Sequence, residues 1–145
     1  MATFGTFVSG QVLTAAELNT AGEWQSYTPT WTQSATITKT VNWARYTQLG
    51  KWVQVSIKMT ASSNGTSSNN VLIGLPVSAS TNNLILGLAH FNTSTATTAR
   101  FALFNSSTTM RFSTSFATGI DLTSSFQTQI LSGDVVHIQF AYEAA

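Results

Sequence analysis

Regular alternation of apolar and polar residues is the feature that most constrains the fold of this chain. Between Trp52 and Met59, Val, Ile and Met alternate with Gln, Ser and Lys, and residues 135–142 repeat the pattern after a Ser-Gly-Asp turn. Because side chains alternate between the two faces of a strand, both segments predict strands with one buried face. Turn residues separate further segments of this kind at spacings near ten residues. These predicted strands cover 36–39, 41–47, 71–75, 84–91, 100–104, 110–116 and 125–131.

Eight or nine such strands predict an all-β fold, an antiparallel β-sandwich. The chain has 145 residues, enough for one sizeable core, and we place that domain at 27–145 and a short N-terminal arm with a helix at 1–26. Segment 84–91 is apolar at both alternating positions, so we expect it to be buried on both faces. Segment 62–70 consists of Ser, Asn, Gly and Thr, and we predict a mobile loop tip that is too polar to pack.

The N-terminal arm carries two coinciding signals for the start of a helix. Thr14 and Glu17 match a capping box, and the leucines on either side have the spacing of a hydrophobic staple. We therefore predict a helix over 15–21 that stops at Gly22. Two turns of helix are marginal in water, so this helix must dock on something. It either packs over one end of its own domain or belongs to an arm that inserts into a neighbouring protein; the apolar anchors of that arm would be Phe4, Phe7, Val12, Leu13 and Leu18.

The composition excludes several classes of function. Charged residues make up 8% of the chain, against about 25% in ordinary soluble domains, while 24 Thr and 18 Ser supply polarity without charge. A formal charge of +1 from scattered residues predicts no binding to nucleic acid or to an anionic membrane. With zero Cys, disulfides, thiolate metal sites and iron–sulfur clusters are excluded. The apolar run at 84–89 is too short to span a membrane, and the N-terminus lacks a basic secretory leader, so we expect synthesis and folding in a cytoplasm.

Side chains suited to catalysis are scarce and scattered. His90 and His137 both fall in predicted strands, where packing or an interface explains a histidine better than metal binding does. Asp134 follows Gly133 and is interpreted as a turn residue. The five carboxylates form no facing pair, and no nucleophile elbow, phosphate loop or dinucleotide fingerprint is present. We therefore predict a protein that is not an enzyme and that uses no cofactor or metal.

The aromatic residues leave two interpretations open. Trp24, Trp31, Trp43 and Trp52 gather in and around the first hairpin, among Tyr, Gln and Ser. Such residues can fill a core or a subunit interface, which we favour. Alternatively, the four tryptophans stack on sugar rings while neighbouring amides and hydroxyls hydrogen-bond a glycan.

Four motifs in the first 80 residues carry a resemblance to a known group of proteins. FVSGQVLTAAELN at 7–19 resembles the opening of many tailed-bacteriophage structural proteins, especially minor tail or fibre proteins of phages that infect actinobacteria. YTPTWT at 27–32, RYTQLGKWVQV at 45–55 and LPVS at 75–78 resemble their subsequent motifs, in the same order. LSGDVVHI at 131–138 is similar to the last strand of jelly rolls of the tumour-necrosis-factor and complement globular-head type.

The resemblance implies a jelly-roll-like domain that assembles as a homotrimer. The chain has no long fibre shaft or coiled coil, which favours a compact knob on the virion surface, either a head decoration protein or a short tail appendage. Its N-terminal arm would dock on phage capsid or tail proteins, after synthesis in the host bacterial cytoplasm. The alternative function is a receptor-binding knob that recognises host cell-surface carbohydrate.

Overall fold

Ten antiparallel strands form one hydrogen-bonded sheet in the computed structural model, which describes residues 22–83, 85–94, 96–113 and 125–145 together with Gly10, Val12, Thr14 and Ala15. The strands are β1 (Gln25–Ser26), β2 (Trp31–Gln33), β3 (Ala35–Thr36), β4 (Lys39–Leu49), β5 (Trp52–Ala61), β6 (Leu72–Gly74), β7 (Ile85–Asn92), β8 (Thr97–Ser106), β9 (Thr109–Phe112) and β10 (Val135–Glu143). The predicted all-β antiparallel class is confirmed.

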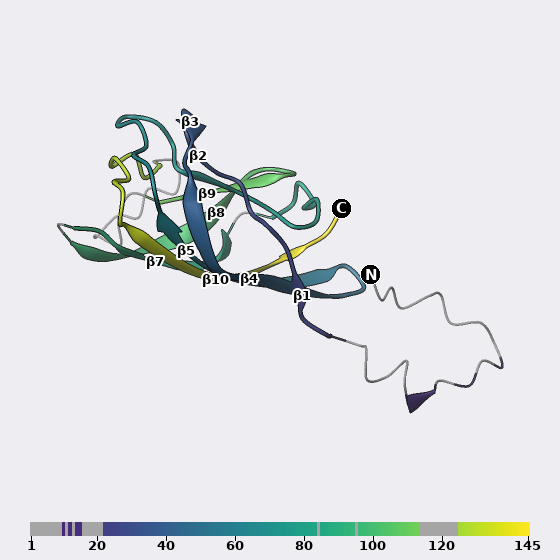
Figure 1. Ribbon diagram of the computed structural model, residues 1–145. Coiled ribbons are helices and arrows are strands. Elements are labelled where there is room, and N and C mark those ends of the chain that lie inside the picture. The colour runs from purple at the N-terminus through teal and green to yellow at the C-terminus, as the bar shows by residue number, and fades with distance from the viewer. Residues whose placement is uncertain are drawn as a thin grey trace.

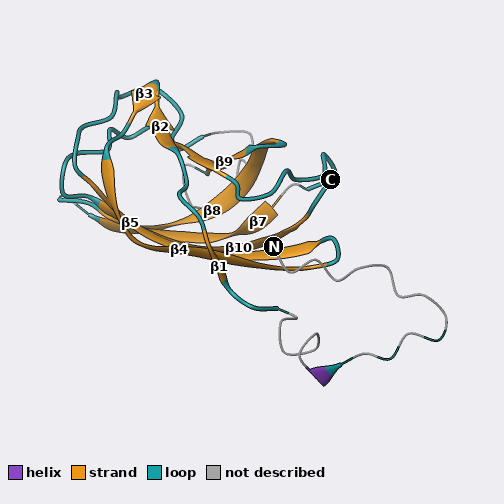
Figure 2. Ribbon diagram, turned by 45° about the vertical axis from the view of Figure 1, so that its right-hand side comes forward, coloured by secondary structure: helices purple, strands orange, loops and turns teal. Residues whose placement is uncertain are grey.

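The sheet curls over a single core. Its strand order is β1-β4-β5-β10-β7-β8-β9-β6-β2-β3, and Figure 1 shows β2 and β3 standing above the long strands β4, β5, β10 and β7. Figure 2 shows the long strands as one lower layer with β2, β3 and β9 over it. Trp31 from β2, Ile73 from β6 and Ile57 from β5 all belong to the same buried cluster. The two ends of the sheet therefore enclose the core between them.

The strands with the clearest alternation fold as the pattern predicts. Alternate residues of β5 and β10, from Val53 to Ala61 and from Val136 to Tyr142, point into the core, and the residues between them face outward, where Ser56 is buried against Trp43. β10 pairs with β5 from Val135 to Glu143 and with β7 from Val135 to Phe140. The last strand of the chain thus lies at the centre of the sheet. The core-facing residues of these two strands are Val53, Val55, Ile57, Met59, Ala61, Val136, Ile138, Phe140 and Tyr142.

The prediction that segment 84–91 is buried on both faces is wrong. Ala89 and Phe91 are buried, but Leu88 is 55% exposed and His90 is exposed. β7 belongs to a single curled sheet, between β10 and β8, and only one face of that sheet packs on the core. None of the described segments forms a second layer over the opposite face, and Leu88 therefore reaches solvent.

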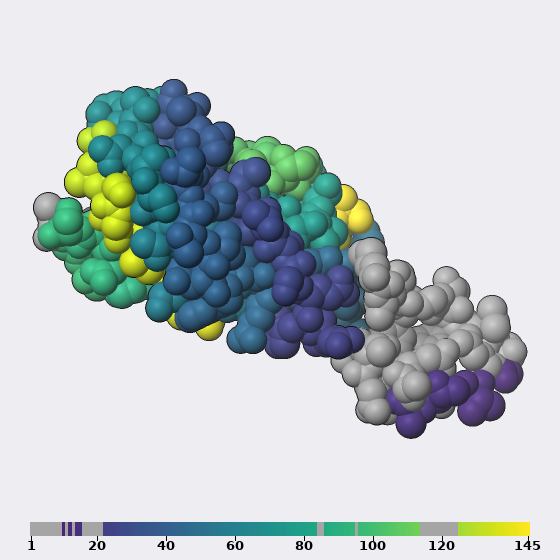
Figure 3. Space-filling view, viewed as in Figure 1, coloured from purple at the N-terminus to yellow at the C-terminus, as the bar shows by residue number. Residues whose placement is uncertain are grey.

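Segment 125–131 is also not the predicted strand, because its backbone groups bond to a loop and to side chains. Ser125 forms an isolated bridge to Ser113, and the carbonyl of Ile130 accepts from the amide of Gly65 (2.7 Å). The yellow-green segment 126–131 lies beside the teal loop 62–70 in Figure 3. The prediction of a loop too polar to pack is therefore wrong as well, since this loop closes over the buried side chain of Gln33.

The N-terminal predictions fall mostly outside the described residues. Ala15 is described with helical geometry, and the rest of the predicted helix, 16–21, is not among the described residues. Within the described part of the chain, no helix has the length and hydropathy that crossing a membrane requires.

Candidate functional site

The outward face of β4, β5, β10, β7 and β8 is the candidate site, and we call it the outer face. Register fixes which side chains meet on it. Trp43 pairs with Lys58, Lys58 with His137, and His137 with His90, so one row of side chains crosses four neighbouring strands. These positions face outward because the residues on either side of them in β5 and β10 point into the core. The outer face is therefore aromatic and basic along this row.

Trp43 is held in place by its neighbours on the row. Its indole Nε1 donates to Ser56 Oγ at 3.3 Å, and Lys58 Nζ lies 5.1 Å from the ring centroid. The ring of His137 meets the indole edge to face, with centroids 5.4 Å apart. Trp43 is 39% exposed, but a cation and an imidazole already occupy its surroundings. His137 thus lies in a strand and packs on an aromatic ring, as expected from the sequence.

Trp24 has a similar arrangement at the edge of the sheet. It precedes β1, and Arg45 of β4 places its guanidinium 4.8 Å from the indole centroid. This distance is typical of a cation–π contact. Trp24 is 41% exposed, and its contact with Arg45 links the start of the β domain to β4.

Trp31 does not belong to any exposed site. It is completely buried in β2, where it pairs with Ile73 of β6 and joins the core cluster. Its ring can present no face to a ligand, so the prediction of Trp31 as a glycan-stacking residue is wrong. The physical reason is the curl of the sheet, which turns β2 over the core.

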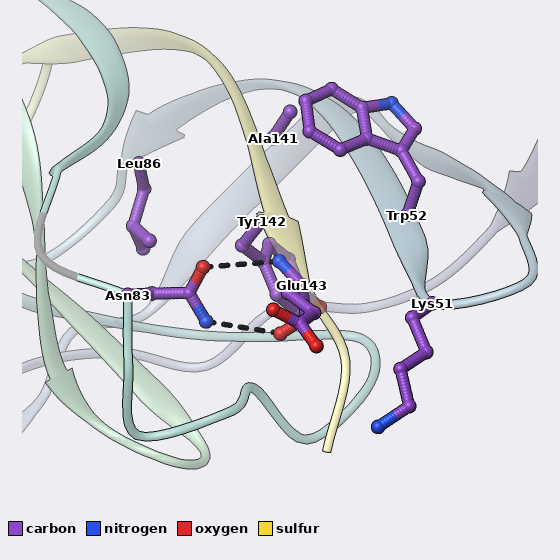
Figure 4. Close-up of a pocket in the computed structure, with 7 residues that line it drawn as sticks. All are labelled: Lys51, Trp52, Asn83, Leu86, Ala141, Tyr142 and Glu143. Atoms are coloured by element: carbon purple, nitrogen blue, oxygen red, sulfur yellow. Dashed lines mark hydrogen bonds between the residues drawn. The ribbon is translucent and has the colours of Figure 1, made fainter.

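Trp52 is the most exposed of the four tryptophans, at 57%. It begins β5 and lines a hollow of about 540 Å³, shown in Figure 4, with Leu86, Ala141 and Glu143. Asn83 forms one wall of this hollow, because its side-chain amide donates to the Glu143 carbonyl (3.0 Å) and accepts from the Glu143 amide (3.1 Å). Trp52 is a candidate from the sequence, but the hollow beside it could not be predicted, because its walls come from segments far apart in the chain.

The predicted anchors of the N-terminal arm are placed by the structure in one case. Val12 is 82% exposed. Phe4, Phe7, Leu13 and Leu18 lie outside the described residues. Their role as anchors remains a prediction.

The ionisable groups that are described do not gather into a metal centre. Within the described ranges, no group of three or more His, Cys, Asp or Glu could hold a metal ion. Asp134 is buried and accepts hydrogen bonds from the amides of Leu131 (2.8 Å) and Ser94 (3.1 Å). Its interpretation as a turn residue is confirmed, because its backbone amide and one carboxylate oxygen both bond Leu131 across the turn that leads into β10, while the other oxygen bonds the loop after β7.

Comparisons with protein-family models, with curated proteins and with solved structures found no match to this chain.

Proposed function

We propose that this chain is a structural protein of the exterior of a tailed-phage virion, either a head decoration protein or a short tail appendage. Its domain would be jelly-roll-like and trimeric, and its N-terminal arm would attach it to capsid or tail proteins. The order of the four motifs in the first 80 residues supports the proposal. So does the low content of charged residues, which gives copies of the chain little mutual repulsion.

The observation that carries the proposal is the position at which the described core begins. Among the described residues, the strands begin at Gln25 and the buried core begins at Trp31. The described residues before Gly22 contribute no side chain to that core. The described residues of this segment, Gly10, Val12, Thr14 and Ala15, are all exposed, which leaves the Val12 side chain accessible to another protein.

Deleting residues 1–22 tests the attachment. We expect the shortened chain to fold, with an unchanged β-type circular dichroism spectrum, and to be absent from particles of a phage that encodes it. A matched pair of point variants separates attachment from folding. Val12→Asp should reduce incorporation, whereas Leu49→Asp, at a 57% exposed position of the domain, should not. Normal incorporation of the shortened chain would show that the arm is not the anchor.

The oligomeric state is tested separately. Sedimentation equilibrium of the full chain should give three times the 15.5 kDa chain mass. A monomer at micromolar concentration would contradict the trimer, while leaving the result of the incorporation experiment unaffected.

A second candidate function is a receptor-binding knob for host cell-surface carbohydrate. The exposure of Trp52 at the sheet surface favours it, since neither a cation nor a ring among the described residues stacks on its indole. Aromatic rings with a free face can stack on sugars, and nearby amides can bond their hydroxyl groups.

A further inference from the structure

Trp52 differs from the other tryptophans in what surrounds its ring. Trp31 is buried, a guanidinium lies over Trp24, and an ammonium group and an imidazole lie against Trp43. Within the described part of the chain, neither a cation nor another aromatic ring stacks on Trp52. Its ring is therefore available to a ligand from solution.

A continuous groove leads away from Trp52 along β10. The hollow at Trp52 shares Leu86 and Ala141 with a second hollow of about 430 Å³, which in turn shares Leu88 and Gln139 with a third of about 400 Å³. The groove follows β10 from Glu143 to His137, roughly 20 Å at about 3.3 Å per residue. That length suits a chain of several linked rings better than a single small molecule.

The middle of the groove is lined by the backbone where β7 and β10 meet and by the small side chain of Ala141. Gly87 of β7 lies against β10 so closely that a Cβ there would come within 2.6 Å of the Phe140 Cα atom. Ala141 adds only a methyl group, and Figure 4 shows it between Trp52 and Leu86. Trp52 and Ala141 line both the first and the second hollow, so the indole stands beside the groove where the two hollows join.

The polar groups in the groove are mainly neutral. Gln54 and Gln139 line the central hollow, and neither side-chain amide forms a hydrogen bond with another described residue. Each amide offers two donors and one acceptor, as sugar hydroxyl groups require. The charges in the groove are one ammonium and one carboxylate, Lys51 and Glu143, both at the Trp52 end. This balance matches a neutral ligand and gives no net attraction to a polyanion.

We infer that this groove is a binding site for a neutral oligosaccharide. Trp52 stacks on one sugar ring, and Gln54 and Gln139 hydrogen-bond the hydroxyl groups of the rings that follow along β10. The inference rests on the second candidate function and is independent of virion attachment, because the groove lies in the β domain. Loss of glycan binding and loss of incorporation are therefore separate results.

The test uses the full chain and a panel of six-unit neutral oligosaccharides of glucose, N-acetylglucosamine, mannose, galactose and rhamnose. Binding is measured by calorimetry, and the side-chain amide signals of Gln54 and Gln139 are followed by nuclear magnetic resonance. We expect saturable binding to at least one sugar, with shifts of both amide signals. An absence of binding across the panel at millimolar sugar would overturn the inference.

A matched pair of variants locates the site. Trp52 and Leu49 are directly paired on β5 and β4 and are both 57% exposed, but only Trp52 lines the groove. Trp52→Ala should weaken binding at least about tenfold, the effect of losing one aromatic contact, whereas Leu49→Ala and Trp43→Ala should leave it unchanged. Equal effects of Trp52→Ala and Leu49→Ala would refute the site. So would a change of oligomeric mass in Trp52→Ala, which would make the groove a contact between copies of the chain.

Discussion

At the residue scale, the hydroxyl groups of Tyr142 and Tyr27 contribute differently to stability. The Tyr142 hydroxyl donates to the Val77 carbonyl (2.7 Å) and accepts from the Val77 amide (3.2 Å). The Tyr27 hydroxyl is buried and has no partner among the described residues. A buried hydroxyl without a partner loses the hydrogen bonds that water gave it in the unfolded chain. Tyr142 therefore stabilises the fold through its hydroxyl, and Tyr27 only through its ring.

Replacing each tyrosine by phenylalanine should reveal this difference. We expect Tyr142→Phe to lower the free energy of unfolding by about 1–3 kcal/mol, since the Val77 backbone loses its partner. Tyr27→Phe should leave it unchanged or raise it by about 1 kcal/mol. Urea denaturation at pH 7 measures both. A larger loss for Tyr27→Phe than for Tyr142→Phe would contradict the assignment.

The same two groups predict a loss of stability in alkali. Burial raises the pKa of Tyr142 to about 12, despite its bond to Val77, and also raises the pKa of Tyr27. In the unfolded chain both phenols ionise near pH 10. Their stabilising contribution is thus complete below pH 10 and is lost as the pH rises toward 12, by roughly 2–3 kcal/mol for Tyr142. Urea denaturation between pH 8 and 12 should show this loss in the natural chain and a smaller one in Tyr142→Phe; equal losses would argue against it.

Gln33 holds together segments that are distant in the sequence. Its side chain is completely buried, donates to the carbonyls of Asn69 (3.1 Å) and Thr128 (2.9 Å), and accepts from the amide of Ile130 (3.0 Å). We expect Gln33→Leu to lower the free energy of unfolding by about 2–4 kcal/mol, because it leaves these buried backbone groups unpaired. Gln54→Leu, at an exposed position, is the control and should change it by less than about 0.5 kcal/mol. Similar losses in the two variants would contradict a special role for Gln33.

At the scale of elements, the contact between β7 and β10 depends on Gly87. A methyl group there would overlap the β10 backbone beside Phe140. Gly87→Ala should lower the free energy of unfolding by about 1–3 kcal/mol or more, the cost of overpacking a rigid contact. Leu88→Ala, the next residue and 55% exposed, should cost less than about 1 kcal/mol. Thermal unfolding compares them, and an unaffected Gly87→Ala variant would show that the strands can separate without cost.

The individual strands show how much of the fold can be predicted from the alternation of apolar and polar residues alone. β5 and β10 were predictable because their alternation is regular and their turn residues are clear. The burial of segment 84–91 was not predictable, because apolar residues at both alternating positions are buried only where a second layer covers the outward face. The turn at Asp134 could be predicted from its neighbours. The buried role of Gln33 could not, because the amide of Ile130 that it accepts from is 97 residues away.

At the scale of the whole molecule, the order of strands in space differs from their order in the chain. β10, the last strand, lies between β5 and β7, and its removal would split the sheet and expose the core faces of both. A chain that ends at Asp134 should therefore fail to fold, while a chain that lacks residues 1–22 should fold. Circular dichroism and thermal unfolding distinguish these outcomes. Cooperative unfolding of the chain ending at Asp134 would contradict the central role of β10.

The sequence by itself determined the fold class, the two best strands, the faces those strands bury, and the turn before β10. These are local properties, since alternation and turn chemistry act over a few residues. Only the tertiary structure decided that Trp31 is buried, that Leu88 reaches solvent, and that the ring of Trp52 stands free above a groove. Each of these depends on which strands become neighbours and on what covers them. The spacing of residues along one strand does not encode that information.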